Sequence, residues 1–366
     1  MKHLVFVLFC FYHTFSVAQN INENFEKWPV VEKAINITGI DLSPDGNTLA
    51  MVCGKNQPLL LYDYKTKTII QEINVNSKCL GYNVFYSKKG NYLLLQEKKI
   101  ETSFKKAKQA DYVIVDLNSN KVIHSFNKIS DAKISFDEKQ VITLENGTVY
   151  FRDIKTGKKH KEFKPEGACN ALAISPDGKD LAVVKKPTKS DIKMLASKNV
   201  SKKAIKSAAK SKHLITIYDT ESYQLKSLIP DFYDNINLLF YTDNGDRLLS
   251  FNVASNSYIN VALPKEDYQP TREGYLSRTS TQPEFAYSPN GEHFGVATVE
   301  AFPSLNIYDV ESGSVIDRYD TKMKIWKNMK KKIYAGSNTS FVFLPDNKHV
   351  LIAYGNSLIK WRFDKE

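Results

Sequence analysis

Short apolar segments separated by turn residues recur along the whole chain. The pattern is clearest where DAKISF (131–136), QVITLE (140–145) and TVYFRD (148–153) follow one another, with the polar KHKEFK (159–164) after them. Apolar segments rich in β-branched and aromatic residues, joined by Asn, Asp and Gly, predict antiparallel hairpins. Each unit is therefore expected to be a meander of four strands, of which the last meets water.

The second segment of a unit is commonly apolar at every position. Examples are LAVV (181–184), LLLQ (93–96) and VLIAY (350–354). A strand that packs on one side alone alternates apolar and polar residues, whereas a continuous apolar segment fits a strand covered on both faces. This indicates sheets that are sandwiched between neighbouring sheets.

The hairpin at the start of a unit occurs seven times. The copies are LSPDGNTLAMV (42–52), YSKKGNYLLLQ (86–96), SFDEKQVITLE (135–145), ISPDGKDLAVV (174–184), YTDNGDRLLSF (241–251), YSPNGEHFGVA (287–297) and FLPDNKHVLIAY (343–354). Once the irregular segments are set aside, the spacing is about 40 residues, and a period near 40–45 with four strands per unit is typical of a β-propeller blade.

The units resemble WD-repeat β-propellers, and the resemblance covers about residues 29–366. The resemblance is based on the SPDG turns and on the ends of the third strands. At these ends the Trp-Asp pair of the family is replaced by Tyr62-Asp63, Val115-Asp116, Arg152-Asp153, Tyr218-Asp219 and Tyr308-Asp309. No Gly-His pair precedes the repeats, so the resemblance implies a divergent, exported member without the internal hydrogen-bond network of the family. We interpret the five aspartates as caps of the turn between strands three and four.

The expected fold class is all-β: a seven-bladed β-propeller of four-stranded antiparallel blades, with the ring closed by an N-terminal strand. The last unit has three strands, and WPVVEKAINI (28–37) is the candidate for its missing outer strand. Such closure would leave few exposed strand edges. A six- or eight-bladed ring is the alternative, because the fifth unit is degenerate after SNSYINVAL (255–263).

The first residues have the pattern of a secretory signal. Lys2 and His3 form a basic start, Leu4–Tyr12 is apolar, and Ser16-Val17-Ala18 is a small-residue cleavage site. The apolar segment is shorter than the ~20 residues that span a membrane, and no later segment is long enough. We therefore expect a signal peptide at 1–18, a propeller at 28–366, and a chain exported to the periplasm or the extracellular space.

Neither catalysis nor metal binding is indicated by the sequence. After signal removal three cysteines remain, Cys53, Cys79 and Cys169, and an odd count without close spacing disfavours a disulfide framework or a zinc site. Buried free thiols are the expected state, with a Cys53–Cys79 bridge as the alternative. The five histidines after the signal are scattered, and no nucleophile or phosphate-loop motif occurs. We expect no metal, no cofactor and no enzymatic activity.

Charge is concentrated in three interruptions of the repeat. Segments 97–110, 185–212 and 320–336 carry net charges of +3, +9 and +5, whereas the whole chain carries +11. The rest of the molecule is therefore mildly acidic, at −6. The first two lie between the second and third strands of blades two and four, and the third lies between blades six and seven, which places all three on one face of the predicted disc.

These observations predict a non-catalytic scaffold that binds an acidic protein or an anionic polymer or surface through a lysine-rich top face. Export disfavours nucleic acid as the partner, and the oligomeric state is left open. The alternatives are solvated loops without a partner, and a propeller hydrolase or lactonase with its site at the central channel. The candidate partner-binding residues are Lys105, Lys106, Lys186, Lys193, Lys202, Lys203, Lys206, Trp326, Lys330, Lys331 and Lys332.

Overall fold

The structure is a computed structural model. It describes residues 25–75, 81–98, 109–198, 200–230, 236, 238–242, 244–252, 257–263, 273–275, 284–297, 304–320 and 340–363. Within these ranges, neither helix has the length and apolar character required to cross a membrane.

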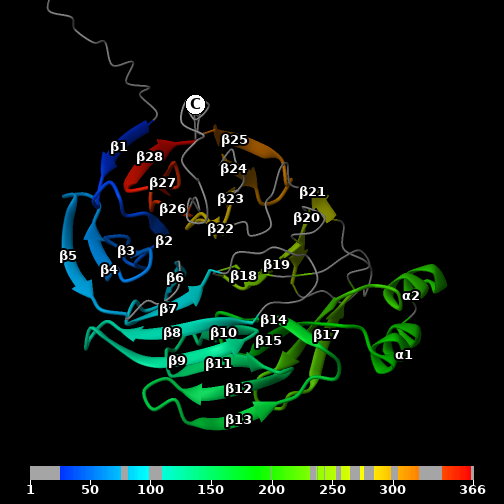
Figure 1. The fold of residues 1–366 in the computed structure, drawn as a ribbon. Coiled ribbons are helices and arrows are strands. Elements are labelled where there is room, and N and C mark those ends of the chain that lie inside the picture. Colours follow the sequence, from blue (N-terminus) through cyan, green and yellow to red (C-terminus); the bar gives the residue numbers. More distant parts are fainter. Residues whose placement is uncertain are drawn as a thin grey trace, which may run out of the picture.

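The described residues form seven four-stranded antiparallel sheets (Figure 1). The first, innermost strands are β2 (Ile37–Leu42), β6 (Tyr82–Tyr86), β10 (Asp131–Ile134), β14 (Cys169–Ile174), β18 (Leu238–Tyr241), β22 (Glu284–Tyr287) and β26 (Ser340–Phe343). The second are β3 (Thr48–Cys53), β7 (Tyr92–Glu97), β11 (Gln140–Glu145), β15 (Asp180–Lys185), β19 (Arg247–Asn252), β23 (His293–Ala297) and β27 (His349–Tyr354). The third are β4 (Leu59–Asp63), β8 (Ala110–Asp116), β12 (Thr148–Asp153), β16 (Leu214–Asp219), β20 (Ser257–Ala262), β24 (Ser304–Asp309) and β28 (Ser357–Arg362). The outer strands are β5 (Thr68–Ile73), β9 (Lys121–Ile129), β13 (Lys159–Phe163), β17 (Leu225–Ile229), β21 (Glu273–Tyr275), β25 (Val315–Asp320) and β1 (Phe25–Pro29).

The core lies between the sheets. Each pair of neighbouring sheets shares an apolar cluster, including the last sheet and the first, where Leu351 and Trp28 pack with Met51. Residues of the second strands, such as Val183 and Leu351, are completely buried because they are covered on both faces. The sheets therefore form a ring of blades, which is the β-propeller architecture that the repeat predicts.

The predicted bounds of the N-terminal strand need correction. The outer strand of the last sheet is Phe25–Pro29, which pairs with β28, and not the segment 28–37. Residues 30–36 only connect it to the first blade, whose inner strand starts at Ile37. The insertion of the fourth blade adds two short helices to the β-propeller, α1 (Lys189–Ser197) and α2 (Lys202–Ala208).

Side chains also join the innermost strands of neighbouring blades. Asp41 of β2 accepts the backbone N–H of Tyr86 in β6 at 2.6 Å, and Asp131 of β10 accepts that of Leu172 in β14 at 3.0 Å. Burial raises the pKa of Asp41 to about 7, against the opposing effect of the N–H groups that it accepts. These hydrogen bonds fix the position of one inner strand relative to the inner strand of the next blade.

The turn that opens a blade has a recurring hydrogen-bond pattern. In the Ser43–Asn47 turn the Ser43 hydroxyl donates to Asp45 and accepts the N–H of Thr48 at 2.8 Å, and the Ser175 turn repeats this pattern with Asp177 and Asp180. Gly46 closes the turn at φ +71°, a value that residues with a Cβ rarely adopt. Ser-Pro-Asp-Gly therefore encodes this turn directly.

The aspartates at the ends of third strands cap the following turn, as predicted. Asp153 accepts the N–H groups of Thr156 at 2.7 Å and Lys155 at 3.1 Å, and Asp63 and Asp219 make the equivalent bonds. These backbone donors lower the pKa of all three carboxyls. Their role is structural, since these carboxylates accept hydrogen bonds from the backbone of the turn that follows each of them.

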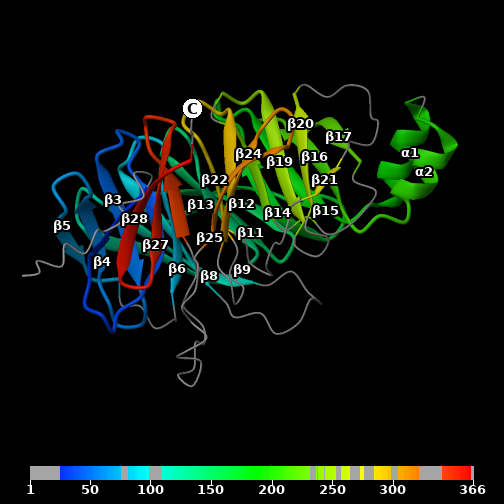
Figure 2. The same ribbon diagram turned by 90° about the horizontal axis from the view of Figure 1, so that it is seen from above.

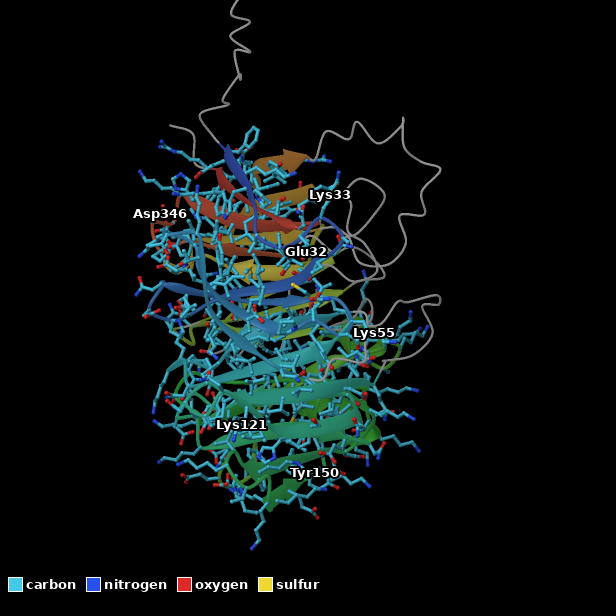
Figure 3. All side chains as sticks on the ribbon, turned by 60° about the vertical axis from the view of Figure 1, so that its left-hand side comes forward. Glu32, Lys33, Lys55, Lys121, Tyr150 and Asp346 are labelled. Atoms are coloured by element: carbon cyan, nitrogen blue, oxygen red, sulfur yellow. The ribbon has the colours of Figure 1, made fainter. Side chains whose placement is uncertain are left out.

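The ring has two distinct faces. The end of each second strand lies beside the start of the inner strand, as Lys185 pairs with Cys169 and Glu97 with Tyr82. We call this side, where the connections between second and third strands leave, the loop face. The other is the turn face, with the Ser-Pro-Asp-Gly turns. Figure 3 shows Lys55, from the β3–β4 connection, and Asp346, from the β26–β27 turn, on opposite sides of the ring.

Candidate functional site: the lysine-rich helical hairpin

The insertion in the fourth blade is a pair of short helices. Helix α1 starts after Thr188, whose hydroxyl accepts the N–H of Asp191, while the Asp191 carboxylate accepts the N–H of Thr188 at 2.8 Å. This reciprocal pair of hydrogen bonds is a capping box. Ser201 caps α2 through the N–H of Ala204. We call residues 186–213 the helical hairpin.

The helical hairpin is packed against the ring through its own apolar face. Leu195 and Ala208 are buried against Leu214 of β16 and Leu228 of β17, with Ile192, Met194 and Ile205 at the margin. Figures 1 and 2 show both helices beyond the rim of the ring, next to β17. The helices therefore extend the fourth blade outward and do not lie over the centre of the disc.

A buried ion pair joins the helical hairpin to the ring. Lys185 Nζ at the end of β15 lies 2.9 Å from Asp191 Oδ1 in α1, and the two side chains are 2% and 5% exposed. Lys185 also donates to the Glu166 carbonyl at 3.0 Å, and Asp191 Oδ2 accepts the Thr188 hydroxyl at 2.7 Å. Because every charged atom of the pair has partners, burial of both ions is tolerated here.

The remaining lysines of the insertion all face solvent. The exposed ones are Lys186, Lys189, Lys193, Lys198, Lys202, Lys203, Lys206, Lys210 and Lys212. Asp191 is the single acidic residue of 185–212 and is occupied by Lys185. Nine exposed lysines therefore lie on a docked element whose single acid is buried in an internal ion pair.

The structure brings five of the predicted binding residues onto this element. Lys186, Lys193, Lys202, Lys203 and Lys206 are all exposed on the helical hairpin. The other predicted residues, Lys105, Lys106, Trp326, Lys330, Lys331 and Lys332, lie outside the described residues. Their segments leave the ring after β7 and β25.

The structure assigns free thiols to Cys53 and Cys169, and Cys79 lies outside the described residues. Burial raises the pKa of Cys53 to about 12 and that of Cys169 to about 11, so both thiols stay protonated at neutral pH. In the part of the chain that the structure describes, no three His, Cys, Asp or Glu side chains come together in a way that could hold a metal ion.

The central channel contains features that the sequence analysis did not find. Lys98, the residue after β7, pairs with Glu284 at the start of β22 and donates to the Thr38 carbonyl in β2. Burial lowers the pKa of Lys98, and the Glu284 carboxylate opposes that shift. These residues come from three blades, and Lys98 and Glu284 alone are 186 positions apart, so no local pattern could have linked them.

Comparison with known proteins supports the fold. No model of a known protein family matches the chain, and no curated protein matches its sequence. Among solved structures it is similar to the β-propeller domain of Cps50 (Swd1) from Myceliophteria thermophila, with a TM-score of 0.63 and 13% identity over 93% of this chain and 100% of that one. The fold is therefore that of a WD-repeat-type β-propeller. At this identity the similarity shows the fold alone.

Proposed function

We propose that this protein is an exported, non-catalytic propeller scaffold that binds an acidic protein or an anionic polymer through a lysine-rich surface. The observation that carries the proposal is the helical hairpin: nine exposed lysines on an element whose one acid is buried in an internal ion pair. Clustered charge of one sign raises the local concentration of oppositely charged partners and accelerates their association.

The rigidity of the attachment supports binding rather than solubility as the role of these lysines. The Lys185–Asp191 pair, the capping box and the apolar contacts hold both helices against β16 and β17. A loop that only needed to remain hydrated would gain nothing from this ordering. A preorganised surface, in contrast, loses less conformational entropy when a partner binds.

The other two basic segments extend the same proposal. Segments 99–108 and 321–339 lie outside the described residues, but their attachment points are known. β7 ends on the loop face beside the start of β6, and the second basic segment precedes the start of β26 on that face. Both are therefore anchored on the side of the ring where the helical hairpin begins.

The proposal is tested with fluorescently labelled poly-L-glutamate and dextran sulfate as anionic probes. We expect binding that weakens about tenfold or more between 50 and 200 mM salt, because exposed charges are screened within about 10 Å at 0.1 M. Lys193, Lys202, Lys203 and Lys206 are replaced together by Gln. The matched control replaces four exposed lysines of turns and strand ends, Lys121, Lys139, Lys155 and Lys179.

The hairpin variant should bind both probes at least fivefold more weakly than the control variant. Equal losses in the two variants would show that net charge alone matters and would overturn the helical hairpin as the site. Export is tested separately, by N-terminal sequencing of protein recovered outside the cytoplasm, which should begin at Gln19. A chain retained inside with Met1 intact would contradict that part of the proposal.

A further inference from the structure

A cavity of about 290 Å³ lies in the wall of the central channel. It runs along the inner strands of four consecutive blades, β6, β10, β14 and β18, so it is open to the middle of the ring and remote from the helical hairpin. This volume is close to the lower end of the ~300–1,000 Å³ typical of ligand pockets.

The cavity wall is largely aromatic and aliphatic. Phe85 of β6, Phe136 after β10 and Phe240 of β18 contribute three rings from three blades. Phe85 belongs to an innermost strand, yet it is 37% exposed, and Ile134 is also only partly buried. Apolar surface left in contact with water is unfavourable, and a mostly apolar pocket with a few polar groups is typical of a ligand site.

Two ammonium groups stand at this wall. Lys133 Nζ lies 6.0 Å from the centre of the Phe240 ring, and Lys88 Nζ lies 5.7 Å from that of Phe136. One acid, Asp131, also lines the cavity and pairs with Lys133 at 2.8 Å. The charged residues that line the cavity are therefore these two lysines and Asp131.

The aspartate is held by the fold and not free for a ligand. Asp131 is 7% exposed and accepts the backbone N–H groups of Ala132 at 2.8 Å and Leu172 at 3.0 Å. Its carboxylate therefore links blade three to blade four. Lys133, whose side chain is 28% exposed, keeps this carboxylate as its partner, and its ammonium group also lies over the Phe240 ring at the cavity.

We propose that this channel cavity binds a small monoanion with a single ring, that is, an aromatic carboxylate. The ring would pack among Phe85, Phe136 and Phe240, and the carboxylate would lie between the ammonium groups of Lys133 and Lys88. The volume suits one ring with a short acidic chain, and the two ammonium groups at the wall suit a carboxylate. The site does not involve the helical hairpin and does not depend on the function proposed above.

The test uses phenylacetate as the probe, with 2-phenylethanol and phenylethylamine as neutral and cationic analogues of the same shape. Isothermal titration calorimetry on the full chain should show phenylacetate binding at least fivefold tighter than the alcohol, and the amine weakest. The variant in which residues 187–212 are replaced by Asn-Gly should bind phenylacetate unchanged. Absence of phenylacetate binding at 10 mM, or equal binding of all three compounds, overturns the proposal.

Two substitutions locate the site. Phe85→Ala removes a ring that is already partly exposed, and we expect it to weaken phenylacetate at least fivefold. Lys88→Met and Lys133→Met should each reduce the preference for phenylacetate over 2-phenylethanol, and Lys88→Met remains informative if Lys133→Met fails to fold. Lys139→Met, on the turn face, is the control and should bind as the wild type does. Wild-type affinity in Phe85→Ala and in the folded lysine variants would place the binding elsewhere and overturn the assignment.

Discussion

At the scale of single residues, the turn-face motif serves two purposes. Gly46 supplies the positive φ of its turn, and it also gives space to a neighbour: a Cβ placed on it would lie 2.5 Å from Cγ of Pro345, in the turn of the last blade. Pro44 lies against Gly90 and Pro176 against Gly245 in the same manner. Proline of one turn therefore packs on glycine of the next blade around the ring.

This arrangement predicts different costs for chemically identical substitutions. Gly178 has φ +75°, close to the +71° of Gly46, but a Cβ on it would meet nothing within 4 Å. Gly178→Ala should cost about 1 kcal/mol from backbone strain. Gly46→Ala should cost roughly 1–3 kcal/mol more, from the clash with Pro345.

Urea unfolding of the two variants measures the difference. The double variant Gly46→Ala/Pro345→Ala should lose the excess cost, because the clashing ring is gone. If Gly46→Ala and Gly178→Ala were equally destabilised, the contact between neighbouring turns would contribute nothing.

At the scale of elements, the insertion shows how a blade can carry an added structure without disturbance of its strands. Lys185 pairs with Leu214 in the register of β15 and β16, so the helical hairpin leaves and returns at adjacent positions. The sequence placed this insertion correctly between the second and third strands of blade four. It assigned Lys185 to the charged surface, but Lys185 is the last residue of β15 and is buried.

The buried ion pair predicts that Asp191 is far more important for stability than any exposed lysine beside it. Asp191→Ala leaves the Lys185 ammonium buried without its counter-ion and should cost about 3–5 kcal/mol. Lys186→Met, at an exposed neighbouring position, should stay within about 0.5 kcal/mol. Urea unfolding, together with the rate of tryptic cleavage in the helical hairpin, reports the loss.

The double variant Lys185→Met/Asp191→Leu should recover most of the stability, since it removes both charges. An Asp191→Ala variant as stable and as protease-resistant as Lys186→Met would show that the pair does not anchor the helical hairpin.

At the scale of the whole molecule, Lys98 and Glu284 link blade two to blade six across the channel, and their side chains are 8% and 16% exposed. Burial lowers the pKa of Lys98. The unfolded chain therefore holds this proton more tightly than the folded one, and the free energy of unfolding rises with pH as Lys98 loses its proton.

Glu284→Gln should make that pH dependence stronger. Without the carboxylate, nothing opposes the effect of burial on the Lys98 pKa, and the uncompensated charge should cost about 3 kcal/mol or more at pH 7. The deficit relative to the wild type should shrink toward pH 10, where Lys98 deprotonates. Urea unfolding at both pH values checks this, with Lys98→Met/Glu284→Leu as the variant without the dependence. A deficit that stays constant with pH would contradict the assignment to Lys98.

The sequence by itself determined the meander units, their hairpin turns and the capping role of the aspartates such as Asp153, because these depend on dihedral preferences and hydrogen bonds within a few residues. It also fixed the site and charge of the insertion, since an interrupted repeat is visible as a pattern. The bounds of individual strands were predicted less well. The outer strand of the last sheet was assigned to 28–37, whereas it spans 25–29. A strand that pairs with residues more than 300 positions away carries no local signal for its bounds.

Only the tertiary structure decided which charged side chains are exposed and which are buried in ion pairs. Lys185 and Lys186 are neighbours in sequence, yet one is buried against Asp191 and the other faces water. The channel likewise depends on the closed ring, which brings Phe85, Lys133 and Phe240 from separate blades to one cavity. The physical reason is that turn and strand formation are set by neighbouring residues, whereas burial and charge pairing are set by which distant segments the ring brings into contact.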